Sequence, residues 1–210
     1  MTSLVRTYAE QSDQQLIVDD AVPLDQHDAR GLAGFYLSFG LTLAGFVLAQ
    51  NVLGLTKVLR LRHRFTLIAG FSAAAGLLAA ILAGPVLGAV PAPVIPLALV
   101  LALLAAAAAF TTKLLGTYLG PIGVPAATLL LLTVGNATSG AVIGADLLPG
   151  IARSISAALP PGAAVRAIAD LSYFQGSGAI TPMITLATWA ISAGLLVAVR
   201  SRTRATRATA

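Results

Sequence analysis

The chain has 210 residues, of which 57% are hydrophobic and only 10% charged, whereas a soluble domain carries roughly a quarter charged residues. This composition leaves too little polar surface for a water-soluble globule. The formal charge of +5 is held mostly in two short clusters beside apolar blocks, without interleaved aromatic residues, which argues against nucleic acid as a partner. The sequence has no cysteine, which excludes disulfides, thiolate metal sites and cysteine nucleophiles.

The N-terminal stretch, residues 1–30, is polar and lacks the apolar core of a secretory signal. Acidic residues dominate its second half, where Asp19, Asp20, Asp25 and Asp28 stand against Arg30. We expect residues 1–30 to form an extracytoplasmic polar stub, followed by a transmembrane domain over residues 31–199.

Apolar residues then come in blocks of about twenty, the length that a helix needs to cross roughly 30 Å of hydrocarbon. Three prolines in residues 91–96 separate the second block from the third, which is the shortest and is expected to stop at Lys113. The sequence therefore predicts an all-α polytopic transmembrane helix bundle in the lipid bilayer, with five spans at residues 32–55, 65–90, 97–112, 118–134 and 180–199.

Positive charge predicts the orientation, because short cytoplasmic loops hold the lysines and arginines. One basic cluster follows the first span at residues 57–64, and the other is the basic tail, residues 200–210. Five crossings put both clusters in the cytoplasm and the N-terminus outside, whereas four or six would leave one cluster on the wrong side. A composition rich in arginine, alanine and glycine is typical of a GC-rich bacterium, so we expect a multi-pass protein of the inner membrane.

Small residues recur every four positions in the second predicted span, at Gly76, Ala80, Gly84 and Gly88. Such a face lets another helix approach closely, which matters in lipid because apolar side chains gain little by leaving it. The face is a candidate for helix packing, either within the chain or in a homo- or hetero-oligomer.

Gly120 and Pro121 interrupt the fourth predicted span. A proline within a membrane helix frees backbone carbonyls that neighbouring groups must satisfy, which makes this pair a candidate kink or hinge. The alternative is a helix that begins just after the proline, in whose first turn proline is favoured.

The segment between the last two spans, residues 135–179, is predicted to form short interfacial helices. It opens with a polar run that contains Asn136, a candidate functional or hinge residue. It continues as two amphipathic pieces, residues 151–159 and 163–174, separated by two prolines and a glycine. Arg166 and Asp170 are four apart on the second piece. They are expected to form an exposed structural pair, or functional groups if both face a cavity between spans.

A family resemblance is carried by short motifs in this segment: Gly135-Asn136-Ala137-Thr138-Ser139-Gly140, Leu147-Leu148-Pro149-Gly150 and Leu159-Pro160-Pro161-Gly162. They resemble the end of YhgE/Pip-like membrane proteins, which are similar in turn to the permeases of type-2 ABC exporters. The likeness covers residues 25–199 and implies a domain whose last two spans are joined by interfacial extracytoplasmic helices. Family members have six spans and a large outer domain, so five spans and a stub suggest a truncated or split member.

The resemblance implies a permease-like subunit that moves a hydrophobic or amphipathic substrate, or helps to move it. The sequence has no phosphate-binding loop of the ATPase type, so a separate ATPase would supply the energy. Arg60 and Arg62 are candidate contacts for that cytoplasmic partner, although the basic loop also serves as a plain topology signal. The alternative function is a non-transporting membrane scaffold or accessory subunit.

An enzyme is not expected. His27 and His63 lie outside the predicted spans, and no His-Glu-x-x-His or Gly-x-Ser-x-Gly pattern occurs. None of the five predicted spans contains an aspartate or glutamate, which argues against ion transport by buried carboxylates. We therefore predict no catalytic residues, no metal site and no cofactor.

Overall fold

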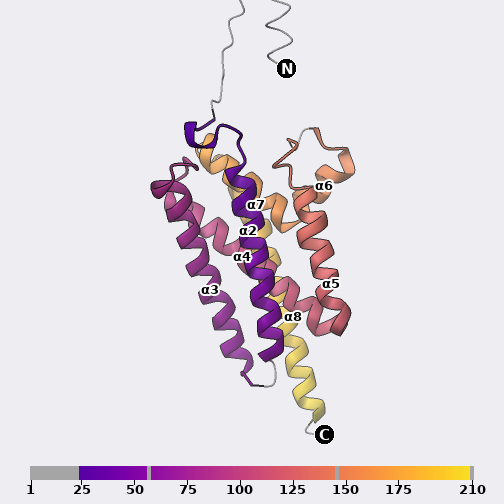
Figure 1. Ribbon diagram of the computed structural model, residues 1–210. Helices are drawn as coiled ribbons and strands as arrows, with labels where there is room; N and C mark the ends of the chain where they lie inside the picture. Colours follow the sequence, from indigo (N-terminus) through magenta and orange to yellow (C-terminus); the bar gives the residue numbers. More distant parts are fainter. Residues whose placement is uncertain (1–23, 56–57, 145–146, 209–210) are drawn as a thin grey trace, which may run out of the picture.

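The computed structural model describes residues 24–55, 58–144 and 147–208, and its regular elements are all helices (Figure 1). The predicted all-α class is confirmed for these ranges. Four of the described helical segments are long and apolar enough to cross a membrane: Ala33–Gly54, Leu61–Val86, Val94–Gly135 and Ile180–Ser201. The outer surface is as apolar as such helices require, since Leu78 is 60% exposed and Ile191 is 61% exposed.

Helix α2 (Ala33–Gly54) follows a short 3-10 turn, η1 (Gln26–Asp28). The carboxylate of Asp28 accepts hydrogen bonds from the backbone N–H groups of Leu32 and Ala33, both at 2.9 Å. These bonds satisfy donors that have no partner within the first turn of a helix. The bounds of α2 match the expected span 32–55 to within a residue.

Helix α3 (Leu61–Ile81) continues as the π-helical turn η3 (Leu82–Val86). It begins earlier than the expected residue 65 and takes Arg62 and Arg64 into its first turn. Pro85 has no N–H to continue the α-helical pattern, and the N–H of Leu87 instead bonds to the carbonyl of Leu82, five residues back, at 2.9 Å. The helix therefore ends before the expected residue 90.

Helix α4 (Val94–Leu119) is much longer than the expected 97–112. Pro96 lies in its first turn, where a missing N–H breaks no helical hydrogen bond. The expectation that Lys113 ends the helix is wrong: the side chain is 1% exposed and lies well inside α4. Lysine is a good helix former, so a single lysine does not stop an otherwise regular helix.

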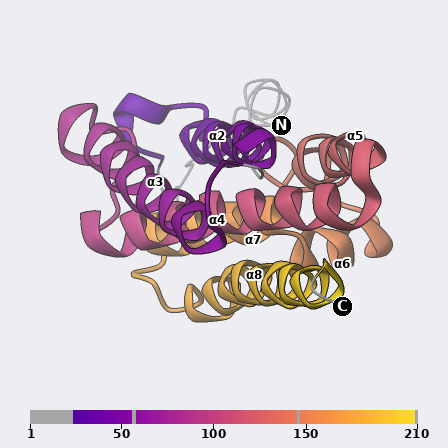
Figure 2. The same cartoon turned by 90° about the horizontal axis from the view of Figure 1, so that it is seen from below.

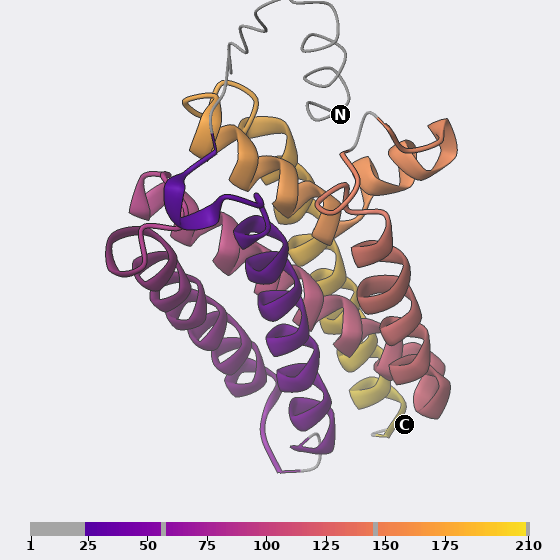
Figure 3. The same ribbon diagram turned by 45° about the horizontal axis from the view of Figure 1, so that its top comes forward.

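The chain turns back after α4 (Figure 3). Gly120, with φ of +61°, ends the helix, and Pro121 lies in the 3-10 turn η4 (Gly120–Ile122). α5 (Gly123–Ala127) turns back against α4, and the π-helical η5 (Thr128–Gly135) continues against α2 and α7. Of the two alternatives for this proline, the helix that begins after it is the one observed.

Two short helices join this returning segment to the last long helix. α6 (Gly150–Ala158) is followed directly by α7 (Pro160–Tyr173), and α8 (Ile180–Ala208) completes the described chain. The paired prolines do not separate two helices as expected. They form the first turn of α7, a position that suits their fixed φ.

Helix α4 is the centre of the bundle. Figure 2 shows it crossing between α2 and α3 on one side and α8 on the other, and it packs against all three. Nine of its residues are completely buried: Leu97, Val100, Leu101, Leu104, Ala105, Ala107, Ala108, Ala109 and Thr112. The first turns of α7 are buried as well, so α7 is part of the core at one end of the bundle and not only a surface helix.

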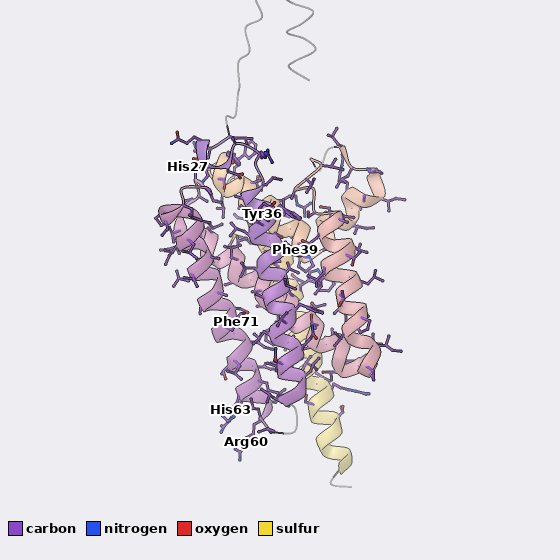
Figure 4. All side chains as sticks on the ribbon, viewed as in Figure 1. His27, Tyr36, Phe39, Arg60, His63 and Phe71 are labelled. Atoms are coloured by element: carbon purple, nitrogen blue, oxygen red, sulfur yellow. The ribbon has the colours of Figure 1, made fainter. Side chains whose placement is uncertain are left out.

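The two ends of the bundle differ in their described charges (Figure 4): all described aspartates lie at one end, together with Arg30, Arg153 and Arg166, whereas the other end has cations and no described aspartate. η1, with Asp25, His27 and Asp28, lies at one end, where Asp25 pairs with His27 at 3.2 Å. Arg60, His63 and the C-terminal end of α8 lie at the opposite end. We call these the acidic end and the basic end.

Candidate functional site

Arg166, one member of the pair predicted on α7, holds α6 and α7 together. Its guanidinium donates hydrogen bonds to the backbone carbonyls of Ala157 at 2.9 Å and Ser156 at 3.4 Å. These carbonyls are in the last turn of α6, where no helical N–H remains to bond them. Burial lowers the pKa of Arg166, and the negative charge of Asp170 acts in the opposite direction.

The carboxylate of Asp170, the other member, lies more than 4.0 Å from the guanidinium of Arg166, so the two form no ion pair. The carboxylate of Asp170 packs instead against Gly178, where an added Cβ would lie 2.8 Å from Oδ2. Arg166 therefore contacts α6, whereas Asp170 contacts the loop before α8.

Asn136 ends the π-helical η5 and is 8% exposed. Its Nδ2 donates to the carbonyls of Leu131 at 3.1 Å and Leu132 at 3.3 Å. A π-helical turn leaves carbonyls without regular partners, and π-helical turns occur frequently at functional sites. The Oδ1 of Asn136 is buried without a hydrogen-bond partner.

The start of α7 lies between η5 and α2. A Cβ on Gly135 would lie 2.9 Å from Cγ of Pro161, and the hydroxyl of Ser38 donates to the carbonyl of Pro161 at 3.2 Å. The candidate Asn136 therefore lies directly beside the buried turn that connects three elements. Gly120 and Pro121 are at the opposite end of the same returning segment, and both are exposed.

The four small residues of the predicted second span separate into two sets. Gly76 lies against α4, since an added Cβ would be 2.5 Å from the backbone nitrogen of Ala102, and Ala80 is completely buried. A Cβ added to Gly84 would have only atoms of Val90 and Val94 within 4 Å, at 3.8 and 3.9 Å. Gly88 lies beyond the helix with φ of +64° and faces His27.

A cavity of about 160 Å³ lies at the acidic end, lined by residues of α2, α7 and the loops beside them. Asp28 and Tyr173 line it. Burial, and after it the negative charge of Asp28, raises the pKa of Tyr173 above its ordinary value of 10.0. The sequence predicted Asp28 in the polar stub and residues 163–174 as an interfacial piece, but it did not bring Asp28 and Tyr173 together, because they are far apart along the chain.

The basic end contains exposed and buried cations. Arg60 and Arg62, the candidate partner contacts, are both exposed. Arg64 is 9% exposed and Lys113 is 1% exposed, and the two positive charges lie close enough to repel each other. Sequence reasoning missed this buried pair. The available signal was Lys113 itself, a charged residue within a long apolar run.

The described residues offer little for metal or acid–base chemistry. No group of three or more His, Cys, Asp or Glu side chains among them is placed to hold a metal ion. The features that distinguish the molecule are instead an irregular returning helix, a buried helix that covers it at the acidic end, and two buried cations at the basic end.

The fold thus defines an all-helical protein with four segments that are long and apolar enough to cross a membrane. No family model, curated protein or solved structure matches the chain. The resemblance to YhgE/Pip-like proteins therefore stays a prediction from the short motifs.

Proposed function

We propose that the protein is a permease-like subunit of an export system, which moves a hydrophobic or amphipathic substrate, or helps to move it, with a separate ATPase. The observation that carries the proposal is the irregular segment from Gly120 to Asn136, packed beneath the buried start of α7. Irregular backbone is tolerated at membrane depth only where protein or a water-filled cavity surrounds it, and broken helices of this kind are typical of transporters. A π-helical stretch has hydrogen bonds that can rearrange locally, as a moving element requires.

The topology that we propose has five membrane passes, with the N-terminus outside and the C-terminus in the cytoplasm of a bacterial cell. In this proposal the apolar run Val94–Gly135, which turns back at Gly120, makes two antiparallel passes. Such a run has 42 residues, about twice what one crossing needs. The position of Arg60 and α8 at one end supports placing that end in the cytoplasm.

Arg60 and Arg62 are the proposed docking contacts for the ATPase. Both are exposed, at the start of α3, on the end of the bundle that the proposal places in the cytoplasm. Exposed charges of this kind set partner choice and association rate more than raw affinity. A partner with an acidic surface would complement them.

The test is affinity purification of the tagged protein from mild detergent, followed by identification of co-purifying subunits and measurement of ATPase activity. The wild-type protein is expected to co-purify with an ATPase. The double variant Arg60→Glu, Arg62→Glu is expected to recover at least about tenfold less ATPase, because the new glutamates repel an acidic partner surface. The matched control is Arg30→Glu, Arg153→Glu, which reverses two exposed cations at the other end of the bundle.

Retention of the ATPase by the first double variant would refute the docking surface, and purification of the wild type without any ATPase would refute the permease role. The second result would favour the other candidate, a membrane scaffold. The observation that favours a scaffold is the closed centre of the bundle, where Leu101, Leu104 and Ala105 of α4 are all completely buried.

A further inference from the structure

A cavity of about 490 Å³ at the basic end lies between α2, α3, α4, α5 and α8, and Arg64 is the buried cation that lines it. Arg64 and Thr117 line it, together with Leu53 of α2 and Val197 of α8. Lys113 lies one helical turn before Thr117, and residues four apart share a face of a helix. The hydroxyl of Thr117 donates to the carbonyl of Lys113 at 2.7 Å, which ties this side of the cavity to that turn.

Lys113 is one of the described residues whose buried polar atoms have no hydrogen-bond partner. Its side chain is 1% exposed, and its Nζ is buried without a hydrogen-bond partner. A buried ammonium without a partner is costly, and native proteins nearly always pair such a group. Arg64 places a second positive charge beside it, so the region gains further from a negative charge.

The described part of the chain does not supply that negative charge. Its acidic residues are Asp25, Asp28 and Asp170, which belong to η1 and α7 at the opposite end of the bundle (Figure 1). No acidic residue of the described ranges therefore compensates Lys113, and an anion from another molecule would do so.

We infer that this cavity binds the phosphate group of an anionic ligand, with Lys113 and Arg64 as its cationic contacts. Guanidinium and ammonium groups are the usual protein partners of phosphate. The cavity is larger than one phosphate needs, and Leu53 and Val197 give it apolar walls. A phosphate attached to a hydrophobic body, as in an anionic phospholipid, fits both properties, and basic pockets between membrane helices bind such headgroups.

The test measures the thermal unfolding midpoint of the purified full-length protein in neutral detergent during titration with phosphatidylglycerol, phosphatidylcholine or inorganic phosphate. Phosphatidylglycerol is expected to raise the midpoint in a saturable manner, whereas the zwitterionic phosphatidylcholine has little effect. Inorganic phosphate alone is tested against sodium chloride at the same ionic strength. Saturable stabilisation by phosphate, without stabilisation by sodium chloride, would support the site with a free phosphate as its ligand.

Variants identify the contacts. Lys113→Met preserves length without charge, and it is expected to weaken phosphatidylglycerol binding at least about tenfold, since a hydrogen bond to a charged group contributes this much. The same variant is expected to unfold at a higher temperature than the wild type in the absence of lipid, because it removes an unpaired buried charge. Arg60→Gln, an exposed cation at the same end, is the control and is expected to change binding by less than about twofold.

Arg64→Gln serves as the second variant, so that the test stands even if Lys113→Met does not fold. Equal stabilisation by phosphatidylglycerol and phosphatidylcholine, with no effect of inorganic phosphate, would overturn the inference. So would wild-type binding by folded Lys113→Met or Arg64→Gln. These outcomes do not depend on whether an ATPase co-purifies, and the site is tested separately from the proposed export role.

Discussion

Gly76 tests whether α3 and α4 are as close as the structure has them. A Cβ at this position would lie 2.5 Å from the backbone nitrogen of Ala102, 2.8 Å from its Cα and 2.8 Å from the carbonyl oxygen of Ala98. All three atoms are backbone, so no side-chain rotation relieves the clash and the helices have to separate. Overpacking of this kind costs about 1–3 kcal/mol.

Gly70 is the matched control on the same helix, because a Cβ there has no atom within 4 Å. Gly70→Ala is expected to stabilise the protein by about 0.5–1 kcal/mol, since alanine loses less conformational entropy than glycine in a helix. Gly76→Ala gains the same stabilisation from the lower entropy loss but is destabilised by the overpacking. The free energy of unfolding of Gly76→Ala is therefore expected to be lower than that of Gly70→Ala by about 1–3 kcal/mol.

Thermal or denaturant unfolding of both variants in the same detergent measures this difference. Equal stability of the two variants would refute the close packing of α3 on α4. The difference is also expected to be independent of protein concentration, because the contact is within one chain. Dependence on concentration would instead assign this glycine face to an oligomer interface.

Three further predictions concern the acidic end. Asn136→Leu removes the donor to two buried carbonyls and is expected to cost about 1–3 kcal/mol of unfolding free energy, whereas Asn51→Leu, at an exposed position of α2, is expected to change it by less than about 0.5 kcal/mol. Arg166→Gln is expected to speed amide hydrogen exchange in α6 without changing exchange in α3; unchanged exchange in α6 would contradict the role of the guanidinium in joining α6 to α7. Because the folded-state pKa of Tyr173 is raised, its contribution to stability is complete below the ordinary tyrosine pKa of 10.0 and is lost as pH rises through the folded-state value. Absorbance titration is expected to show one tyrosine that ionises at high pH, is absent in Tyr173→Phe and ionises at a lower pH in Asp28→Asn; an unshifted curve for Asp28→Asn would show that the carboxylate does not act on the phenol.

Helix positions were largely predictable, because apolar runs long enough to cross a membrane can be located directly in the sequence. α2 and the apolar part of α8 agree with their expected ranges within a few residues. The bounds of α4 were not predictable by the same rule. A lysine after an apolar run predicts a helix end, but whether that lysine is buried depends on packing against helices such as α3 and α8, which come from distant parts of the chain.

The candidate residues illustrate the same limit. The four-residue spacing of Arg166 and Asp170 predicted a possible pair, yet the guanidinium reaches the end of α6 because the carbonyls there have no other donor. Proline positions were also ambiguous, since Pro121 and the pair before Gly162 suit either the break or the first turn of a helix. Tertiary contacts decide between these two alternatives, and a local sequence pattern contains no information on tertiary contacts.

The central position of α4 has a consequence for the assembly of the newly synthesised chain. α2 and α3 each pack mainly on α4 and much less on each other, yet both leave the ribosome before it. Until α4 enters the membrane, the glycine that each presents to it, Gly45 and Gly76, has no helix to meet. Insertion of α4 is thus the step at which the first two helices gain their stable partner, and a nascent chain that stops before it should be a ready substrate for membrane proteases.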